Sequence, residues 1–114
     1  MKDATVTPRI EGDVAVLEFR GPLTIDGGDV LLKNAVRGHL EKGYKKIVLD
    51  LHEVTTIDSS GVGELIAVYT QATNMGAVVK VAGLESVRQT FSITQLISVF
   101  DGFNMTEEAV AALK

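Results

Sequence analysis

The sequence contains no cysteine and only two histidines among its 114 residues. Without cysteine the chain can form neither a disulfide framework nor a thiolate metal site, and this fits a reducing compartment. The histidines, His39 and His52, are too few and too far apart to indicate a metal site. Nucleotide-binding glycine patterns are missing as well, because neither Gly27-Gly28 nor Gly61-Val62-Gly63 has the required spacing. We therefore expect a protein without cofactors or metals.

Long apolar runs and basic clusters are also absent. No segment approaches the roughly 20 apolar residues of a membrane helix, and the N-terminus lacks the pattern of a signal peptide. The formal net charge is -4, and Lys45-Lys46 is the only adjacent basic pair. Because phosphate neutralisation supplies most of the affinity for nucleic acids, such a chain is a poor nucleic-acid binder. We expect a cytoplasmic protein with no membrane span and no nucleic-acid partner.

What the chain does contain is an ordinary globular balance, 46% hydrophobic and 23% charged residues, in a length that suits one domain. Short apolar runs predict strands over Thr5 to Ile10 and Val14 to Phe19, joined as a hairpin. Pro8 would confine the first strand to a sheet edge, and Gly21-Pro22 would end the second.

Two helices are predicted from apolar residues at spacings near 3.6. The first covers Val30 to Leu40, with Asp26 or Asp29 as its cap and Gly43 as its stop. The second runs from Gly61 to Met75. Its expected apolar face consists of Val62, Leu65, Ile66, Tyr69 and Ala72.

Lys45 to Leu51 is the strongest strand pattern and is expected to be central, with Val54 to Ile57 continuing it. Ala77 to Ala82 is a further strand. The last third predicts a helix over Leu84 to Thr94, an edge strand over Ser98 to Phe100, and a helix capped by Thr106 that docks through Val110 and Leu113. This alternation indicates an α/β fold with helices packed on a small mixed sheet.

The run Asp58-Ser59-Ser60-Gly61 lies where a strand gives way to a helix. A purely structural interpretation is that Ser59 or Ser60 caps the helix and Gly61 permits a tight entry. A functional interpretation starts from the same geometry: a phosphate on Ser59 would be tolerated at a helix N-terminus and would add about -1.5 to -2 charges. Both interpretations remain open from local chemistry alone.

The segments Lys46 to Leu51 and Val54 to Gly63 resemble the core of bacterial anti-sigma factor antagonists, members of the sulfate transporter and anti-sigma antagonist (STAS) domain family. The similarity continues through Gly76 to Val81 and Val87 to Phe100. It implies one STAS domain over residues 1–114, with a small mixed sheet and helices mainly on one face.

The resemblance also implies a non-enzymatic partner switch. In the family, the unphosphorylated antagonist binds an anti-sigma factor, often itself a serine kinase, and so releases the sigma factor. The kinase inactivates the antagonist by phosphorylating the residue after the Asp, here Ser59, and a PP2C-type phosphatase reverses this. ATP and Mg²⁺ belong to the kinase. The implied partner contacts are Thr24, Asp26, Ile57, Asp58, Ser60, Gly61, Val62 and Glu64.

One departure from the family pattern concerns Thr24. Many members read Gly-Glu-Leu-Asp where this chain has Gly21-Pro22-Leu23-Thr24, so Thr24 replaces the acid and Asp26 is a candidate substitute. Two alternatives stay open. One is a non-catalytic scaffold or accessory subunit of a transport or stress-signalling complex. The other is an enzyme in which Ser59 is the nucleophile and His52 its base.

Overall fold

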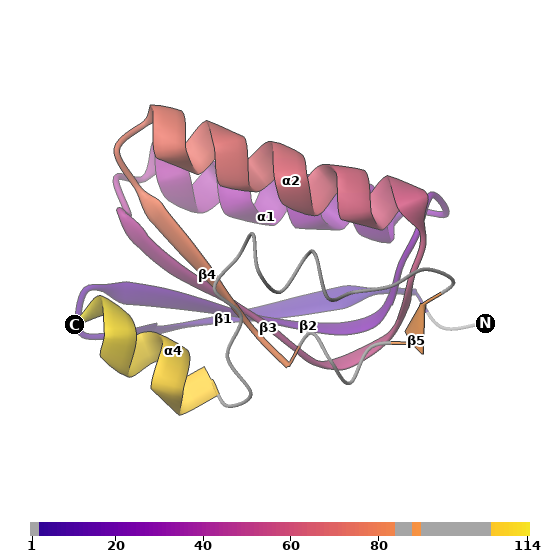
Figure 1. The fold of residues 1–114 in the computed structure, drawn as a ribbon, viewed down its shortest axis with the longest axis horizontal. Helices are drawn as coiled ribbons and strands as arrows, with labels where there is room; N and C mark the ends of the chain where they lie inside the picture. Colours follow the sequence, from indigo (N-terminus) through magenta and orange to yellow (C-terminus); the bar gives the residue numbers. More distant parts are fainter. Residues whose placement is uncertain (1–2, 84–87, 90–105) are drawn as a thin grey trace.

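The structure of the chain is a computed structural model that describes residues 3–83, 88–89 and 106–114. Its elements, in chain order, are β1 (Thr5–Glu11), β2 (Val14–Leu23), α1 (Gly28–Glu41), β3 (Lys46–Ile57), α2 (Ser59–Asn74), β4 (Val78–Ala82), β5 (Arg88–Gln89) and α4 (Thr106–Leu113). Helices α1 and α2 pack together over one face of the sheet, and α4 lies against the other face (Figure 1). The predicted mixed sheet, with its helices mainly on one face, is confirmed.

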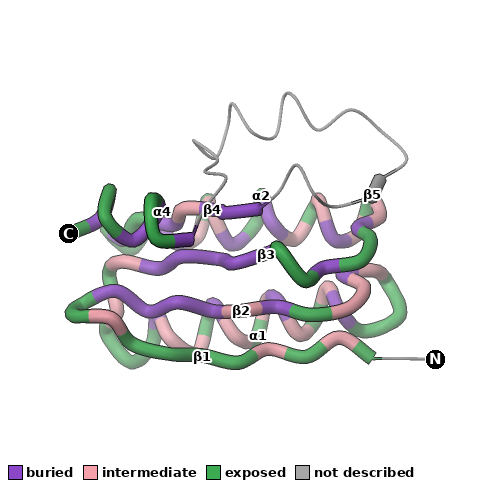
Figure 2. Tube along the Cα trace, turned by 90° about the horizontal axis from the view of Figure 1, so that it is seen from below, coloured by how far each residue is buried: buried purple, intermediate pink, exposed green. Residues whose placement is uncertain are grey.

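The sheet has the strand order β1-β2-β3-β4, with β5 beside the end of β3. β1 and β2 form an antiparallel hairpin, whereas β3 runs parallel to β2, β4 and β5. The central position predicted for β3 is therefore confirmed, as is the edge position of the strand that contains Pro8. In Figure 2 the middle of the sheet is buried and β1 is mostly exposed.

Each face of the sheet carries its own apolar layer, because successive side chains of a strand point to opposite faces. The layer under α1 and α2 includes Leu17, Phe19, Leu32, Leu49 and Leu65. The layer under α4 consists of Val14, Val16, Val48, Ala82, Ala109, Val110 and Leu113. Burying a side chain of this size stabilises the fold by about 1.5–3 kcal/mol. The prediction that Val110 and Leu113 dock the last helix is confirmed.

Strand β2 continues past the glycine and proline that were expected to end it, and that prediction is wrong. Its pairing with β3 shifts register between Gly21 and Pro22 and then resumes as far as Leu23. The pairing with β1 stops at Arg20. Pro22 therefore lies beyond the hairpin and beside a bulge, where its missing N–H removes no required hydrogen bond.

The start of α1 also differs from the prediction. Neither Asp26 nor Asp29 caps the helix; the N-cap is Gly27, with a φ of 129° and no side-chain cap bond. At this φ any residue with a Cβ is strained. A Cβ on the next residue, Gly28, would lie 2.1 Å from the backbone oxygen of Pro22. The close approach of α1 to β2 therefore requires glycine here. The predicted stop at Gly43 is confirmed, since α1 ends at Glu41 and Gly43 has a φ of 96°.

The buried face of α2 is rotated from the predicted one. It consists of Gly61, Leu65, Val68 and Ala72. Val62 and Tyr69 pack at the side of the same core, whereas Ile66 is exposed. The helix lies on β3 and β4 with α1 beside it, so its core-facing stripe is decided by two neighbours and not by its apolar residues alone.

Most of the last third lies outside the described residues. The expected helix over Leu84 to Thr94 is wrong at Arg88–Gln89, which forms strand β5 beside the end of β3. The rest of that helix and the expected edge strand over Ser98 to Phe100 fall outside the described part of the chain. α4 lies where the sequence predicts a last helix, but Thr106 is its first residue and not the N-cap that was expected.

Candidate functional site

The ends of β2 and β3 bring two distant segments of the chain together. The strands are parallel neighbours, and Leu23 pairs with Ile57 at their last residues. The β2–α1 loop, residues 24–27, and the start of α2 therefore leave the sheet at the same edge, on the right of Figure 1. In open α/β sheets this edge, beyond the carboxyl ends of the strands, is where binding sites form.

The carboxylate of Asp58 joins these two segments. Asp58 is the N-cap of α2, and its Oδ1 accepts a hydrogen bond from the N–H of Gly61 at 3.0 Å. Its Oδ2 accepts a second bond from the N–H of Ile25, 33 residues earlier in the chain, at 3.1 Å. The same carboxylate thus caps a helix and fixes a loop.

The charge of Asp58 is stabilised by these bonds. Burial alone would raise the pKa of Asp58, but backbone N–H donors, led by that of Gly61 and followed by that of Ile25, lower it below its ordinary value. The group is therefore ionised at neutral pH and acts as an acceptor for both segments.

Ser59 is the first residue of α2, and it is exposed. The expectation that Ser59 or Ser60 caps the helix is wrong, because Asp58 takes that role. The physical reason is geometric: the capping residue precedes the first helical turn, and the serines already lie within it. Ser60 is half-buried. The side chain of Ser59 is consequently not used as the cap that orders this helix.

Two of the expected contact residues lie inside the protein. Ile57 is buried in the core at the end of β3. Gly61 is buried as well, and a Cβ there would lie 2.1 Å from the backbone oxygen of Leu23. Both positions hold α2 close to β2 and so set the place of Ser59.

The other expected contact residues are at least partly accessible. Thr24 is half-buried, and its Oγ1 accepts a hydrogen bond from the N–H of Asp26 at 3.4 Å. Asp26 is exposed, while Val62 and Glu64 are half-buried on α2. The structure therefore brings Thr24 and Asp26 to the same edge as Asp58 and Ser59.

Ile25 was not among the expected site residues. Its side chain is 70% exposed, more than any other large hydrophobic side chain in the described residues. An isoleucine between Thr24 and Asp26, shortly before Gly27-Gly28, was the available sequence signal. That signal is weak, since single exposed hydrophobic residues are common on protein surfaces.

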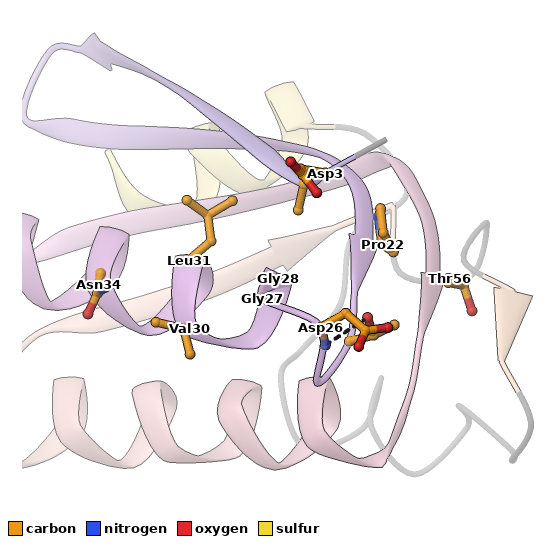
Figure 3. A pocket seen from close by; sticks show the side chains of 11 residues that line it. Asp3, Pro22, Asp26, Gly27, Gly28, Val30, Leu31, Asn34 and Thr56 are labelled. Atoms are coloured by element: carbon orange, nitrogen blue, oxygen red, sulfur yellow. Dashed lines mark hydrogen bonds between the residues drawn. The ribbon is translucent and has the colours of Figure 1, made fainter. Parts of the chain in front are cut away.

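A pocket of about 650 Å³ opens on the other side of the same loop. It lies between α1, the β2–α1 loop and the residues before β1 (Figure 3). Leu31 and Pro22 supply apolar lining, and the carboxylates of Asp3 and Asp26 add negative charge. Ser59 does not line it. An anion would be repelled from this pocket.

The imidazole of His52 contacts the side chains of Asp50 and Thr106. Its Nδ1 lies 2.7 Å from Oδ1 of Asp50 and 3.4 Å from Oγ1 of Thr106. These groups lie on the sheet face that carries α4, so His52 is not arranged as a base for Ser59. His39, expected at the surface, is half-buried and bonds through Nδ1 to the oxygen of Ala35.

Among residues 3–83, 88–89 and 106–114, no group of three or more histidine, cysteine, aspartate or glutamate side chains could hold a metal ion. Within the same ranges, no helix has the length and apolar character needed to cross a membrane.

The exposed β2–α1 loop and the start of α2 thus meet at one edge of a small α/β domain. The model of the STAS domain matches residues 3–109, so the chain belongs to the STAS domain family. It is therefore non-catalytic, as the sequence indicated.

Relatives of this chain are described as candidate anti-sigma factor antagonists. A candidate anti-sigma factor antagonist of Thermotoga neapolitana is 29% identical over 90% of this chain and 91% of its own length. Another, BtrV of Bordetella bronchiseptica, is 30% identical over 73% of this chain and 72% of its own. The crystal structure of a candidate antagonist from Thermotoga maritima superposes with a TM-score of 0.78 at 26% identity, covering 94% of this chain and 92% of that one.

Proposed function

We propose that this protein is an anti-sigma factor antagonist whose docking surface is switched by phosphorylation of Ser59. When Ser59 is unmodified, the surface formed by the β2–α1 loop and the first turns of α2 binds an anti-sigma factor and so releases the sigma factor. The two relatives at 29% and 30% identity, both described as candidate anti-sigma factor antagonists, support the class of function.

The observation that carries the proposal is the accessible, non-capping hydroxyl of Ser59. Since Asp58 caps α2 through Gly61, the fold does not use the Ser59 side chain for that purpose. Ser59 is exposed at the first residue of a 16-residue helix, where the helix dipole favours negative charge. A phosphate there is compatible with the intact fold, which a reversible switch requires.

The effect of the phosphate follows from desolvation. A docking partner must strip water from Ser59, and removing water from a group with about -1.5 to -2 charges is far more unfavourable than removing it from a hydroxyl. The neighbouring carboxylate of Asp58 adds like-charge repulsion. Phosphorylation would thus oppose docking without unfolding the domain.

Partner enzymes, and not this protein, would carry out the transfer and the removal of the phosphate. A serine kinase, which is the anti-sigma factor itself in many such systems, supplies ATP and Mg²⁺ and transfers the phosphate. A PP2C-type phosphatase removes it. Because sigma factors act on RNA polymerase, these encounters would take place in the cytoplasm.

The test compares three forms of the chain with the purified anti-sigma factor of the same cell in a calorimetric titration. Wild type and Ser59→Ala should bind with similar affinity, whereas Ser59→Asp should bind at least about tenfold more weakly, a difference of about 1.4 kcal/mol. Mass analysis of the protein from its own cells should place one phosphate on Ser59. Equal binding of the anti-sigma factor by all three forms would contradict the proposed phosphorylation switch. Capture of a transporter subunit in place of an anti-sigma factor would favour the scaffold alternative.

A further inference from the structure

The β2–α1 loop presents one large apolar side chain in a fixed position. Ile25 is 70% exposed, whereas the next most exposed large hydrophobic side chain among the described residues, that of Val30, is 51% exposed. An isoleucine held in water has no stabilising role in the isolated domain, because its apolar surface is not removed from solvent.

The backbone around Ile25 is nevertheless ordered by specific bonds. Its N–H donates to Oδ2 of Asp58 at 3.1 Å. On the other side, the oxygen of Thr24 accepts from the N–H groups of Gly27 at 3.3 Å and Asp29 at 3.0 Å. A side chain presented on a pre-ordered loop loses little further freedom on binding, which is how interfaces gain affinity from few residues.

The two segments that meet beside Ile25 carry mainly acidic charge, although Arg88 of β5 pairs with Thr56 at the end of β3 and adds one basic residue at this edge. In residues 21–32 and 54–74 the only charged side chains are Asp26, Asp29, Asp58 and Glu64, and there is no lysine or arginine. These two segments meet at the same sheet edge, because Leu23 pairs with Ile57. An apolar side chain with an acidic rim matches an apolar pocket with a basic rim.

We infer that Ile25 is the anchor of the docking surface, and that it inserts into an apolar pocket of the anti-sigma factor bordered by lysine or arginine. Asp58 is a positioning residue: its carboxylate holds the loop that carries Ile25 against the start of α2, next to Ser59 in the chain. This inference rests on the proposed function and adds the residue and the partner chemistry through which it would work.

Asp58→Asn separates the two tasks of the carboxylate. Asparagine is a good N-cap, so its oxygen can still accept from the N–H of Gly61. Its amide NH₂ is a donor and cannot accept from the N–H of Ile25. The variant should therefore keep α2 capped while it releases the loop.

The experiment measures the affinity of wild type, Ile25→Ala, Ile10→Ala and Asp58→Asn for the purified anti-sigma factor at two salt concentrations. Ile10 is the matched control, an isoleucine on edge strand β1 that is 48% exposed. Ile25→Ala should bind at least about tenfold more weakly, as expected of an interface anchor. Ile10→Ala should bind like wild type. Wild-type affinity should fall as salt rises, because the acidic rim faces a basic one.

Asp58→Asn should bind more weakly than wild type while melting at nearly the same temperature. Amide hydrogen exchange should show faster exchange at Ile25 and unchanged protection at Gly61, a separation that a general loss of structure would not produce.

The outcomes distinguish the two proposals. If wild type binds, Ser59→Asp does not, and Ile25→Ala binds like wild type, the anchor inference is overturned and the phosphorylation switch stands. Equal weakening by Ile10→Ala and Ile25→Ala would also overturn it. If wild type binds no anti-sigma factor, the proposed function and the anchor fail together.

Discussion

Asp50 and His52 lie two residues apart on β3, with Oδ1 of the carboxylate 2.7 Å from Nδ1 of the imidazole. The same Oδ1 accepts from the backbone N–H of His52 at 3.1 Å. The hydroxyl of Thr106, at the start of α4, also bonds to this carboxylate. Since Asp50 is only 7% exposed, a nearly buried charge joins the central strand to the last helix.

This carboxylate predicts a pH-dependent stability. Burial raises the pKa of Asp50, but the bonds from His52 and Thr106 outweigh it and lower the pKa below its ordinary value. A carboxyl whose pKa is lower in the folded state stabilises the fold above its unfolded pKa of about 3.9, and this contribution is lost as pH falls through the folded pKa. Acid should therefore weaken the attachment of α4.

Urea unfolding of wild type and Asp50→Asn at several pH values measures this contribution. Near neutral pH wild type should be more stable by about 1.5–3 kcal/mol, the range for hydrogen bonds to a charged group. The difference should shrink as the pH falls below about 5 and through the lowered pKa of Asp50. A difference that stays constant across this range would contradict the assignment.

Gly61→Ala should destabilise the domain, although alanine is the better helix former. The added Cβ would lie 2.1 Å from the oxygen of Leu23, so α2 would have to move away from β2, at a cost of about 1–3 kcal/mol. Gly63→Ala is the matched control, since a Cβ there meets nothing within 4 Å. It should stabilise the same helix by about 0.5–1 kcal/mol. Thermal or urea unfolding measures both, and equal effects would contradict the close approach.

Asp58→Ala and Ser59→Ala should differ in stability because only the first removes the cap of α2. Loss of the bond between Asp58 and Gly61 should lower the free energy of unfolding by about 0.5–2 kcal/mol. Ser59→Ala should leave it within about 0.5 kcal/mol of wild type, as for most surface substitutions. The comparison is made by urea unfolding. A larger loss of unfolding free energy for Ser59→Ala than for Asp58→Ala would indicate that Ser59, and not Asp58, caps α2.

Ser59→Asp should preserve or slightly raise stability even where it abolishes partner binding. An acidic side chain in the first turn of a helix is favoured by the dipole by about 0.3–1 kcal/mol, partly offset here by the adjacent Asp58. Circular dichroism and a thermal melt should therefore match wild type. A variant that lost both binding and its cooperative melt would indicate a structural role for Ser59 and not a switch.

The sequence by itself determined the local parts of this protein. The sequence predicts the strand of Lys46–Ile57, the helix that follows it and the position of Ser59 at their junction. It can do so because apolar periodicity and the change from strand to helix depend on neighbouring residues only. The same holds for the edge strand with Pro8 and for the end of α1 near Gly43.

Only the tertiary structure decided which residues act across the sheet edge. The bond of Asp58 to Ile25 and the burial of Gly61 against Leu23 both follow from the pairing of Leu23 with Ile57, 34 positions later. The outward position of Ile66 likewise depends on neighbours of α2 that its own periodicity does not include. Such features depend on distances between segments far apart in the chain, and composition and spacing do not contain those distances.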